Sequence, residues 1–275
     1  MQSHRFCFAT LAMGKKYRSL ALELAKDLEK FTDIKFIILT DKPLEFSQQT
    51  NVLAFLHTQQ SVSCYHDKCY VLEKALSLYD ACIFLDADMR ILREIVLQEW
   101  LPGITARSYA NIIKHNQNNT FLPDLQKIAK KWDLDLENIN FVSEFLFVIT
   151  KDNHKEQEFI KLWKKLGNYL ELHGIYNGEG NAIALAAAKA GLIIRYDEMP
   201  GIDFFNDKIE KIRIQKGQRD ANITQKYFDE YQKIAFPNKP KWQKALDKLG
   251  YIIKRFYLII RLKIKSLADI NFYYK

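Results

Sequence analysis

Two aspartates, Asp86 and Asp88, follow directly after five apolar residues at positions 81–85. Side chains two residues apart in an extended chain point the same way, so one short step places the two carboxylates side by side. Such a pair suits a hard divalent cation, Mn²⁺ or Mg²⁺, which prefers oxygen ligands. A cation held there can also bind diphosphate oxygens and offset the charge that builds on a departing nucleotide. We therefore predict a metal site at Asp86 and Asp88.

The alternative reading of this pair is structural, because two aspartates after a strand can cap a helix or form a turn. Two arguments favour the metal. The carboxylates follow an apolar run and so lie near the low-dielectric interior, where an uncompensated charge is costly. In open α/β sheets, ligands also bind beyond the carboxyl ends of the strands.

Two more charged residues are candidates for chemistry. Glu179 lies between Gly178 and Gly180, and glycines allow a ligand to approach the backbone closely. We interpret Glu179 as an active-site residue; the alternative is a helix-start glutamate that interacts with the helix dipole. Lys68 begins the helix that leads into residues 81–85, and it is a candidate partner of a diphosphate or, alternatively, a solvated helix lysine.

Polar residues near the first two predicted strands are candidates for nucleotide contacts. Thr10 and Tyr17 could contact a bound ligand, with strand-end capping and core packing as the alternative. Asp41 could bond the base or ribose, although Asp-Lys-Pro is also a good turn. Glu144 interrupts an apolar strand, and it could touch the donor or acceptor sugar or face solvent.

Strands and helices alternate in the first half of the chain, which predicts βαβ units with a parallel sheet and a Rossmann-like α/β fold. The predicted strands are 5–11, 34–39, 52–56 and 81–85, and the predicted helices are 17–31 and 69–79. The second half is less regular, with predicted strands at 141–150 and 192–196 and helices at 155–172 and 181–190.

Basic charge is concentrated at the end of the chain. From Lys239 onward there are ten Lys or Arg and two Asp or Glu, whereas the rest of the chain carries 31 of each sign. A helical stripe of apolar residues runs through this tail: Leu246, Leu249, Ile253, Phe256, Ile260 and Ile264. A basic amphipathic helix predicts contact with an anionic membrane surface; the alternative is a helix packed on the body with its charges in water. The neutral body argues against a nucleic-acid partner.

Composition predicts a cytoplasmic protein that contacts a membrane only peripherally. No signal-peptide pattern and no apolar run near the ~20 residues of a membrane span is evident. Four cysteines match no zinc spacing, which favours reduced thiols.

The segment 83–89, with Asp86-Ala87-Asp88, resembles the DxD motif of GT-A glycosyltransferases. Phe8-Ala9-Thr10 followed by Tyr17 resembles their nucleotide-binding first strand, and Leu39-Thr40-Asp41 resembles the end of the second strand beside the base. Residues 65–68 resemble the start of their donor-contacting helix. The resemblance covers about residues 4–200 and implies donor contacts at Ala9, Thr10, Tyr17, Thr40, Asp41, Lys68, Asp86, Ala87 and Asp88.

Two retaining families are the most similar. In the family of the blood-group A and B transferases and α-1,3-galactosyltransferase, a Trp-His-Asp-Glu pattern precedes a helix and carries an active-site glutamate. Tyr176-Asn177-Gly178-Glu179 stands in the same order here, with only the glutamate matched. This resemblance implies a catalytic Glu179 and acceptor contacts at Glu144, Tyr176 and Asn177. Residues 235–242 faintly resemble the His-Xaa-Xaa-Gly-Xaa-Xaa-Lys-Pro-Trp motif of the glycogenin-like family but lack its histidine ligand.

We therefore expect a GT-A catalytic domain at 1–238, with a donor half at about 1–100 and an acceptor half at about 101–238, followed by a basic amphipathic helix at 239–275. The expected activity is a retaining, metal-dependent hexosyl or N-acetylhexosaminyl transfer from a UDP-sugar to a glycan or glycolipid of the cell envelope. Two alternatives are a DxD phosphohydrolase of haloacid-dehalogenase type and a non-catalytic module that binds membrane surfaces.

Overall fold

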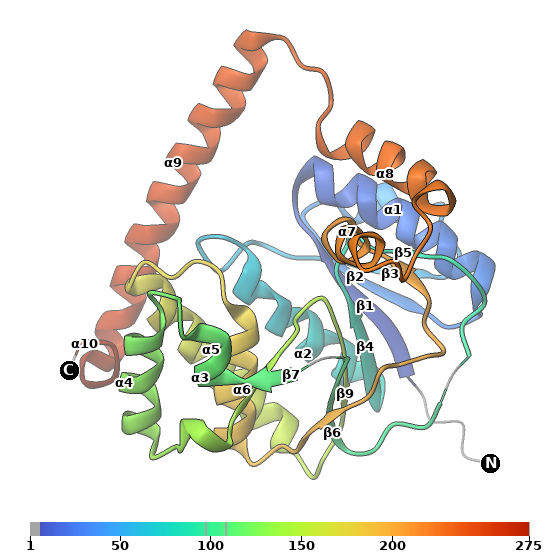
Figure 1. Ribbon diagram of the computed structural model, residues 1–275. Helices are drawn as coiled ribbons and strands as arrows, with labels where there is room; N and C mark the ends of the chain where they lie inside the picture. The colour runs from blue at the N-terminus through green and yellow to red at the C-terminus, as the bar shows by residue number, and fades with distance from the viewer. Residues whose placement is uncertain (1–5, 97, 108, 275) are drawn as a thin grey trace.

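A mixed, mainly parallel sheet with helices on both faces forms the body of the protein (Figure 1). The structure is a computed structural model that describes residues 6–96, 98–107 and 109–274. Within these residues the main sheet has seven strands in the order β10-β6-β9-β4-β1-β2-β3. The predicted α/β class and the long C-terminal helix are confirmed.

The first half of the chain folds as predicted. Its elements are β1 (Phe6–Ala12), α1 (Gly14–Phe31), β2 (Phe36–Thr40), β3 (Val52–Leu56), α2 (Lys68–Leu78) and β4 (Ala81–Leu85). β1 pairs in parallel with β2 on one side and with β4 on the other, and β2 pairs in parallel with β3. The predicted first strand begins at Arg5, which lies outside the described residues.

Short strands and helices build the middle and second half. The strands are β5 (Arg90–Ile91), β6 (Gly103–Ala106), β7 (Tyr109–Asn111), β8 (Asn140–Val142), β9 (Leu146–Thr150), β10 (Ile194–Tyr196) and β11 (Phe204–Phe205). The helices are α3 (Ile112–Asn116), α4 (Leu122–Trp132), α5 (Lys155–Leu172), α6 (Glu179–Ala190), α7 (Asp207–Gln215), α8 (Ala221–Ala235), α9 (Lys241–Ser266) and α10 (Ile270–Tyr274).

The predicted single strand at 141–150 is wrong, because this segment forms two strands of different sheets. β8 pairs with β7 in a small antiparallel ribbon, whereas β9 enters the main sheet antiparallel to both β4 and β6. Residues 143–145 turn the chain between them. Glu144 therefore lies in the turn that precedes β9, and it does not interrupt a continuous strand.

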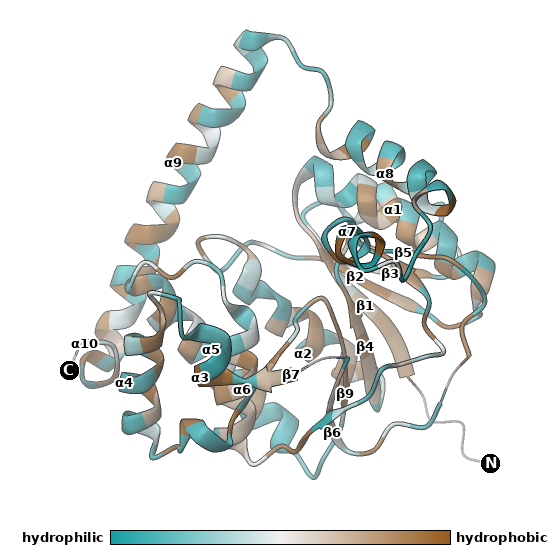
Figure 2. Ribbon diagram, in the orientation of Figure 1, coloured by the Kyte–Doolittle hydropathy of each residue, from teal (hydrophilic) through white to brown (hydrophobic). Residues whose placement is uncertain are grey.

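Alternate residues of the central strands supply two hydrophobic layers, as the two-residue period of a strand requires. Cys7 and Phe84 face α2, α5 and α6 in one core, whereas Phe8 and Ile83 face α1 in the other. The central strands are accordingly hydrophobic along their length (Figure 2). This double cover fixes the strand ends, where the polar side chains emerge.

The C-terminal segment departs from the prediction of one helix over 239–275. α9 ends at Ser266, and a short turn leads into α10, whose Phe272 packs against Trp132 of α4. Only the second half of α9 rests on the body, while its first half stands away as an arm (Figure 1). Among the described residues, no helix is long and apolar enough to cross a bilayer.

Candidate functional site

The order of the strands reverses between β1 and β4. From β1 the chain adds β2 and then β3 on one side, and the helix α2 carries it back to place β4 on the other side of β1. In open α/β sheets, the carboxyl ends of the two strands at such a reversal border a ligand-binding crevice. Asp86 and Asp88 follow β4, and Tyr17 lies on the first turn of the helix that follows β1.

A tight turn presents the two aspartates at the end of β4. The backbone N–H of Asp86 donates to the carbonyl of Phe145 at 2.9 Å, and the N–H of Met89 donates to the carbonyl of Asp86 at 3.0 Å. The aspartates are partly exposed, whereas Ala87 between them and Met89 after them are buried. Burial and the neighbouring Asp86 carboxylate raise the pKa of Asp88 to about 6.

Lys68 connects the first aspartate to the glutamate of the second half. Its Nζ lies 2.7 Å from Asp86 Oδ1 and 3.0 Å from Glu179 Oε1, and the side chain is almost fully buried. Burial alone would lower the pKa of Lys68, but the two carboxylates raise it above its ordinary value. The lysine is therefore an ammonium inside the site, and the alternative of a solvated helix lysine is wrong.

Glu179 is held as an ionised group at the start of α6. Burial alone would raise its pKa, but the Lys68 ammonium lowers it below the ordinary value. Gly178 precedes the helix with a φ of 96°, and its N–H donates to Glu179 Oε2 at 3.2 Å. A Cβ on Gly180 would lie 2.3 Å from the carbonyl oxygen of Val142, so glycine is required where α6 meets β8.

Glu144 is the fourth carboxylate of this region. Its backbone carbonyl lies 3.5 Å from Lys68 Nζ. Burial and the charge of Glu179 raise the pKa of the Glu144 side chain to about 7. A carboxyl group with this pKa can accept or release a proton near neutral pH. The segments around β4, α2, α6 and β9 therefore bring together four acidic residues, Asp86, Asp88, Glu144 and Glu179, around one lysine.

The residues predicted at the first two strands divide into two groups. The Tyr17 side chain is partly exposed. Partial burial, and to a smaller extent the charges of Tyr65, Asp88 and Asp86, raise the pKa of its hydroxyl to about 12. The two aspartates therefore act on the Tyr17 hydroxyl through space. Ala9, Thr10 and Thr40 are buried in the sheet, and the Thr40 hydroxyl donates to the carbonyl of Ala12 at 2.7 Å.

Asp41 has structural partners. Its carboxylate accepts hydrogen bonds from Arg18 Nη1 at 2.8 Å and from the backbone N–H of Gly14 at 3.0 Å. Burial opposes ionisation, but these donors lower the pKa of Asp41. These two hydrogen bonds hold the start of α1 against the end of β2. Arg18 was not predicted, although an arginine on the buried face of an amphipathic helix signals a buried carboxylate partner.

Besides Glu144, the resemblance predicted acceptor contacts at Tyr176 and Asn177, and within the described residues neither of these two side chains bonds to the clustered carboxylates. Asn177 is exposed. Tyr176 packs against the small cluster of Val62, Leu258 and Leu262, and Arg255 of α9 lies 4.5 Å from its ring centroid. Tyr176 therefore contacts the C-terminal helix.

Asn206 is a site residue that the sequence did not indicate. Its Nδ2 donates to Asp88 Oδ1 at 3.2 Å, and its Oδ1 accepts from the backbone N–H groups at the start of α7. One side chain thus caps a helix and orients an aspartate. The asparagine before a helix is a recognisable cap signal, but nothing in the sequence places that cap beside β4.

The donor set fits a divalent cation that is also bound by a ligand. Within the described residues, no group of three or more His, Cys, Asp or Glu side chains forms a ready cage for a metal ion. Mg²⁺ and similar ions commonly take one or two carboxylates and complete their coordination with waters and phosphates. Asp86 and Asp88 match that pattern, and the unbalanced negative charge around Lys68 favours an added cation.

A basic hollow lies where the start of α1 meets the end of α8 and the start of α9. Its volume is about 670 Å³, and its lysines are Lys15, Lys16, Lys233, Lys239 and Lys244, with no acidic residue in the lining. The pKa of Asp88 is raised by burial, and the ammonium of Lys16, which lines this hollow, partly opposes that rise. Residues 235–239 of the segment that resembles the glycogenin-like motif line it.

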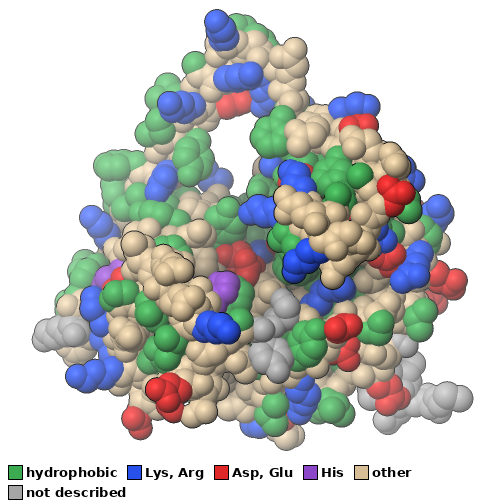
Figure 3. All heavy atoms as spheres, viewed as in Figure 1, with side chains coloured by type: hydrophobic (Ala, Val, Ile, Leu, Met, Phe, Trp, Pro, Cys, Tyr) green, Lys and Arg blue, Asp and Glu red, His purple; other side chains and the backbone are tan. Residues whose placement is uncertain are grey.

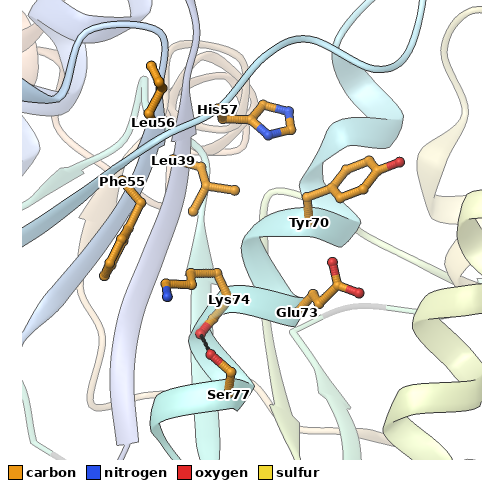
Figure 4. A pocket seen from close by; sticks show the side chains of 8 residues that line it. All are labelled: Leu39, Phe55, Leu56, His57, Tyr70, Glu73, Lys74 and Ser77. Atoms are coloured by element: carbon orange, nitrogen blue, oxygen red, sulfur yellow. Dashed lines mark hydrogen bonds between the residues drawn. The ribbon is translucent and has the colours of Figure 1, made fainter.

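A second hollow, of about 410 Å³, lies between β3 at the edge of the sheet and α2 (Figure 4). Leu39, Phe55 and Leu56 line its strand side, and Tyr70, Glu73 and Lys74 line its helix side. Lys74 Nζ lies 4.1 Å from the Phe55 ring centroid. None of the four clustered carboxylates lines this hollow.

The buried side chain of His66, just before α2, packs against α5. The ring of His66 accepts a hydrogen bond at Nδ1 from Trp163 Nε1 at 3.3 Å. A Cβ on Gly167 would lie 2.7 Å from His66 Cγ, so the ring occupies the space that this glycine leaves. Burial lowers the pKa of His66 to about 4, and the ring is neutral at physiological pH.

Comparisons with known proteins give no assignment. No protein-family model matches the chain, and no curated protein is similar to it.

Proposed function

We propose that this chain is a metal-dependent glycosyltransferase of the GT-A type. It would move a hexose or N-acetylhexosamine from a nucleotide sugar, UDP-linked by the resemblance, to a glycan or glycolipid acceptor. The observation that carries the proposal is the position of Asp86 and Asp88: they follow the strand at the reversal of the sheet, and burial together with the Asp86 charge raises the pKa of Asp88.

The basic hollow supports an anionic donor. A nucleoside diphosphate needs both a cation site and compensating positive charge. Lysines of α1, α8 and the segment 239–244 line the hollow, and one of them, Lys16, lowers the pKa of Asp88. Tyr17, partly exposed near Asp88, is suited to pack against a base or ribose. Together these groups outline a donor site between β1 and β4.

The reaction breaks the bond between the anomeric carbon and the diphosphate oxygen and forms one to the acceptor oxygen. Asp86 and Asp88 would hold Mn²⁺ or Mg²⁺, which when bound offsets charge on the departing diphosphate. Glu179, kept ionised by Lys68, would stabilise positive charge at the anomeric carbon or attack it transiently. Glu144 would accept the proton of the acceptor hydroxyl. Retention follows only from the resemblance.

A thermal-shift screen with nucleotides and nucleotide sugars, with and without Mn²⁺, tests the proposal. A nucleoside diphosphate at about 100 times its dissociation constant stabilises the fold by roughly 2.7 kcal/mol. We expect this shift only with the metal. It should be lost in Asp88→Asn, which leaves the Lys68–Asp86 pair intact, and kept in the exposed control Asp229→Asn.

Two results would overturn the proposal. One is the absence of any nucleotide-dependent shift in the presence of Mn²⁺. The other is release of phosphate from phosphomonoesters without turnover of a sugar nucleotide, which would favour the phosphohydrolase.

A further inference from the structure

The exposed row of large apolar side chains on α9 lies on the side of the helix that faces away from the body. The row is Trp242, Leu246, Leu249, Ile253, Phe256 and Ile260. Trp242 and Phe256 are each 66% exposed, and Ile253 is 62% exposed. The stripe that the sequence predicted is therefore not used to pack the helix on the protein.

The helix packs on the body through other residues. Leu258 and Leu262 are buried, at 3% and 7% exposure, against Val62. Leu258 follows Phe256 by two residues, and Leu262 follows Ile260 by two, which is roughly 200° around a helix. The buried face and the exposed row are thus nearly opposite, so docking on the body leaves the row free.

Hydrogen bonds fix the direction in which the arm points. Arg261 Nη2 donates to the carbonyls of Gln59 and Gln60 at 2.9 and 2.6 Å. Arg255 stacks on Tyr176 one and a half turns earlier. Beyond these contacts, the residues from Lys241 to Lys254 are exposed or partly exposed, and the space-filling view shows a gap between this half of α9 and the body (Figure 3).

The positive charge of α9 indicates which kind of partner can cover the apolar row. α9 contains eight Lys or Arg and one acidic residue, Asp247, which pairs with Lys239 at 2.6 Å. Within the described part of the chain, no Lys or Arg of α9 itself forms an ion pair. Since the rest of the chain is neutral, this charge does not compensate an acidic body. A second copy would bring two strongly basic helices together, whereas an anionic lipid surface offers charge of the opposite sign.

We propose that α9 docks on an anionic lipid surface through the face opposite Leu258 and Leu262, with the row from Trp242 to Ile260 inserted among the acyl chains near the headgroups. The helix is about 39 Å long and lies in the interface plane. Its lysines contact lipid phosphates, and Trp242 at the start of the helix lies at the headgroup level. This inference does not depend on the proposed chemistry of the carboxylates.

Vesicle flotation of the full chain tests the docking. The vesicles are phosphatidylcholine alone or phosphatidylcholine mixed with phosphatidylglycerol. Ile253→Ser is compared with Ile223→Ser, because Ile223 is a helical isoleucine of α8 with a matching exposure of 63%. We expect binding to the mixed vesicles, weakening as salt rises. Ile253→Ser should lower the partition coefficient roughly five- to tenfold, and Ile223→Ser should leave it unchanged.

Circular dichroism and thermal unfolding of both variants establish that neither change unfolds the chain. The proposal is overturned if the wild-type chain floats equally with both kinds of vesicle or with neither. It is also overturned if Ile253→Ser floats like the wild type. A dimer that Ile253→Ser converts to a monomer, seen by light scattering without flotation, would assign the row to a second copy.

Discussion

Replacing Lys68 by methionine should destabilise the protein strongly at neutral pH. Lys68 is the ammonium shared by Asp86 at 2.7 Å and Glu179 at 3.0 Å. Methionine keeps the apolar stem and removes the charge, so Glu179, with a side chain only 4% exposed, is left unpaired. Breaking a buried ion pair by removing one partner costs about 3–5 kcal/mol. We expect a loss of that size in the free energy of unfolding.

The loss should depend on pH. In the wild-type protein the folded-state pKa of Glu179 lies below its ordinary value of 4.5, so this carboxylate contributes stability above that pH and loses it as the pH falls. Without Lys68 the buried carboxylate has its pKa raised above 4.5, and it costs stability as the pH rises. The difference between variant and wild type should therefore grow from about pH 4 to about pH 7.

Urea unfolding followed by circular dichroism at both pH values measures this difference. Lys161→Met is the matched control, because Lys161 is an exposed helical lysine with one surface partner, and its replacement should cost under about 0.5 kcal/mol. The double variant with Glu179→Gln should recover part of the loss, since it removes the stranded charge. An equal loss at both pH values, or a loss no larger than the control's, would refute the reasoning.

Two further predictions concern residues that support the site. Burial raises the pKa of Glu171 to about 7, so the free energy of unfolding should fall by up to about 3 kcal/mol as the pH rises from the ordinary pKa of 4.5 to 7. Glu171→Gln should flatten this part of a urea-measured stability profile, and unchanged profiles would contradict the assignment. Gly180→Ala should cost about 1–3 kcal/mol, because its Cβ would meet the Val142 carbonyl and the Phe141 ring. Gly250→Ala, with open space around it in α9, should stabilise the chain slightly, and equal effects of the two changes would exclude the steric cause.

The alternation of strands and helices could be predicted from the sequence because each element has its own hydrophobic period. The run at 81–85 and the helix at 155–172 were predicted with the bounds that β4 and α5 have. Strand order could not be predicted in the same way. β9 lies between β4 and β6 in the main sheet, whereas its sequence neighbour β8 pairs with β7 in a separate ribbon, because pairing partners are chosen by the packing of the whole sheet. The turn at Glu144 was missed because the residues on either side of it continue the alternation.

The carboxylate pair could be predicted because its signal is local, an apolar strand followed at once by two acids. The partners of the pair are distant in sequence. Lys68 and Asn206 reach the aspartates from α2 and from the start of α7, and no local pattern encodes those contacts. The tail shows a different limit: its apolar stripe was correctly located, but the sequence could not show that Leu258 and Leu262, on the other side of the helix, make the contact with the body.

The absence of a side chain at Gly167 of α5 also affects the neighbouring helix α2. Because the His66 ring fills that space, and Lys68 begins the helix two residues later, any substituent at position 167 would push the ring and move the base of α2. The ammonium at Lys68 would then shift relative to Asp86 without any change in a charged residue. The size of the residue at position 167 is therefore linked to the ion pair at the carboxyl end of β4. A larger residue at position 167 should have effects similar to those of a charge-removing substitution at Lys68.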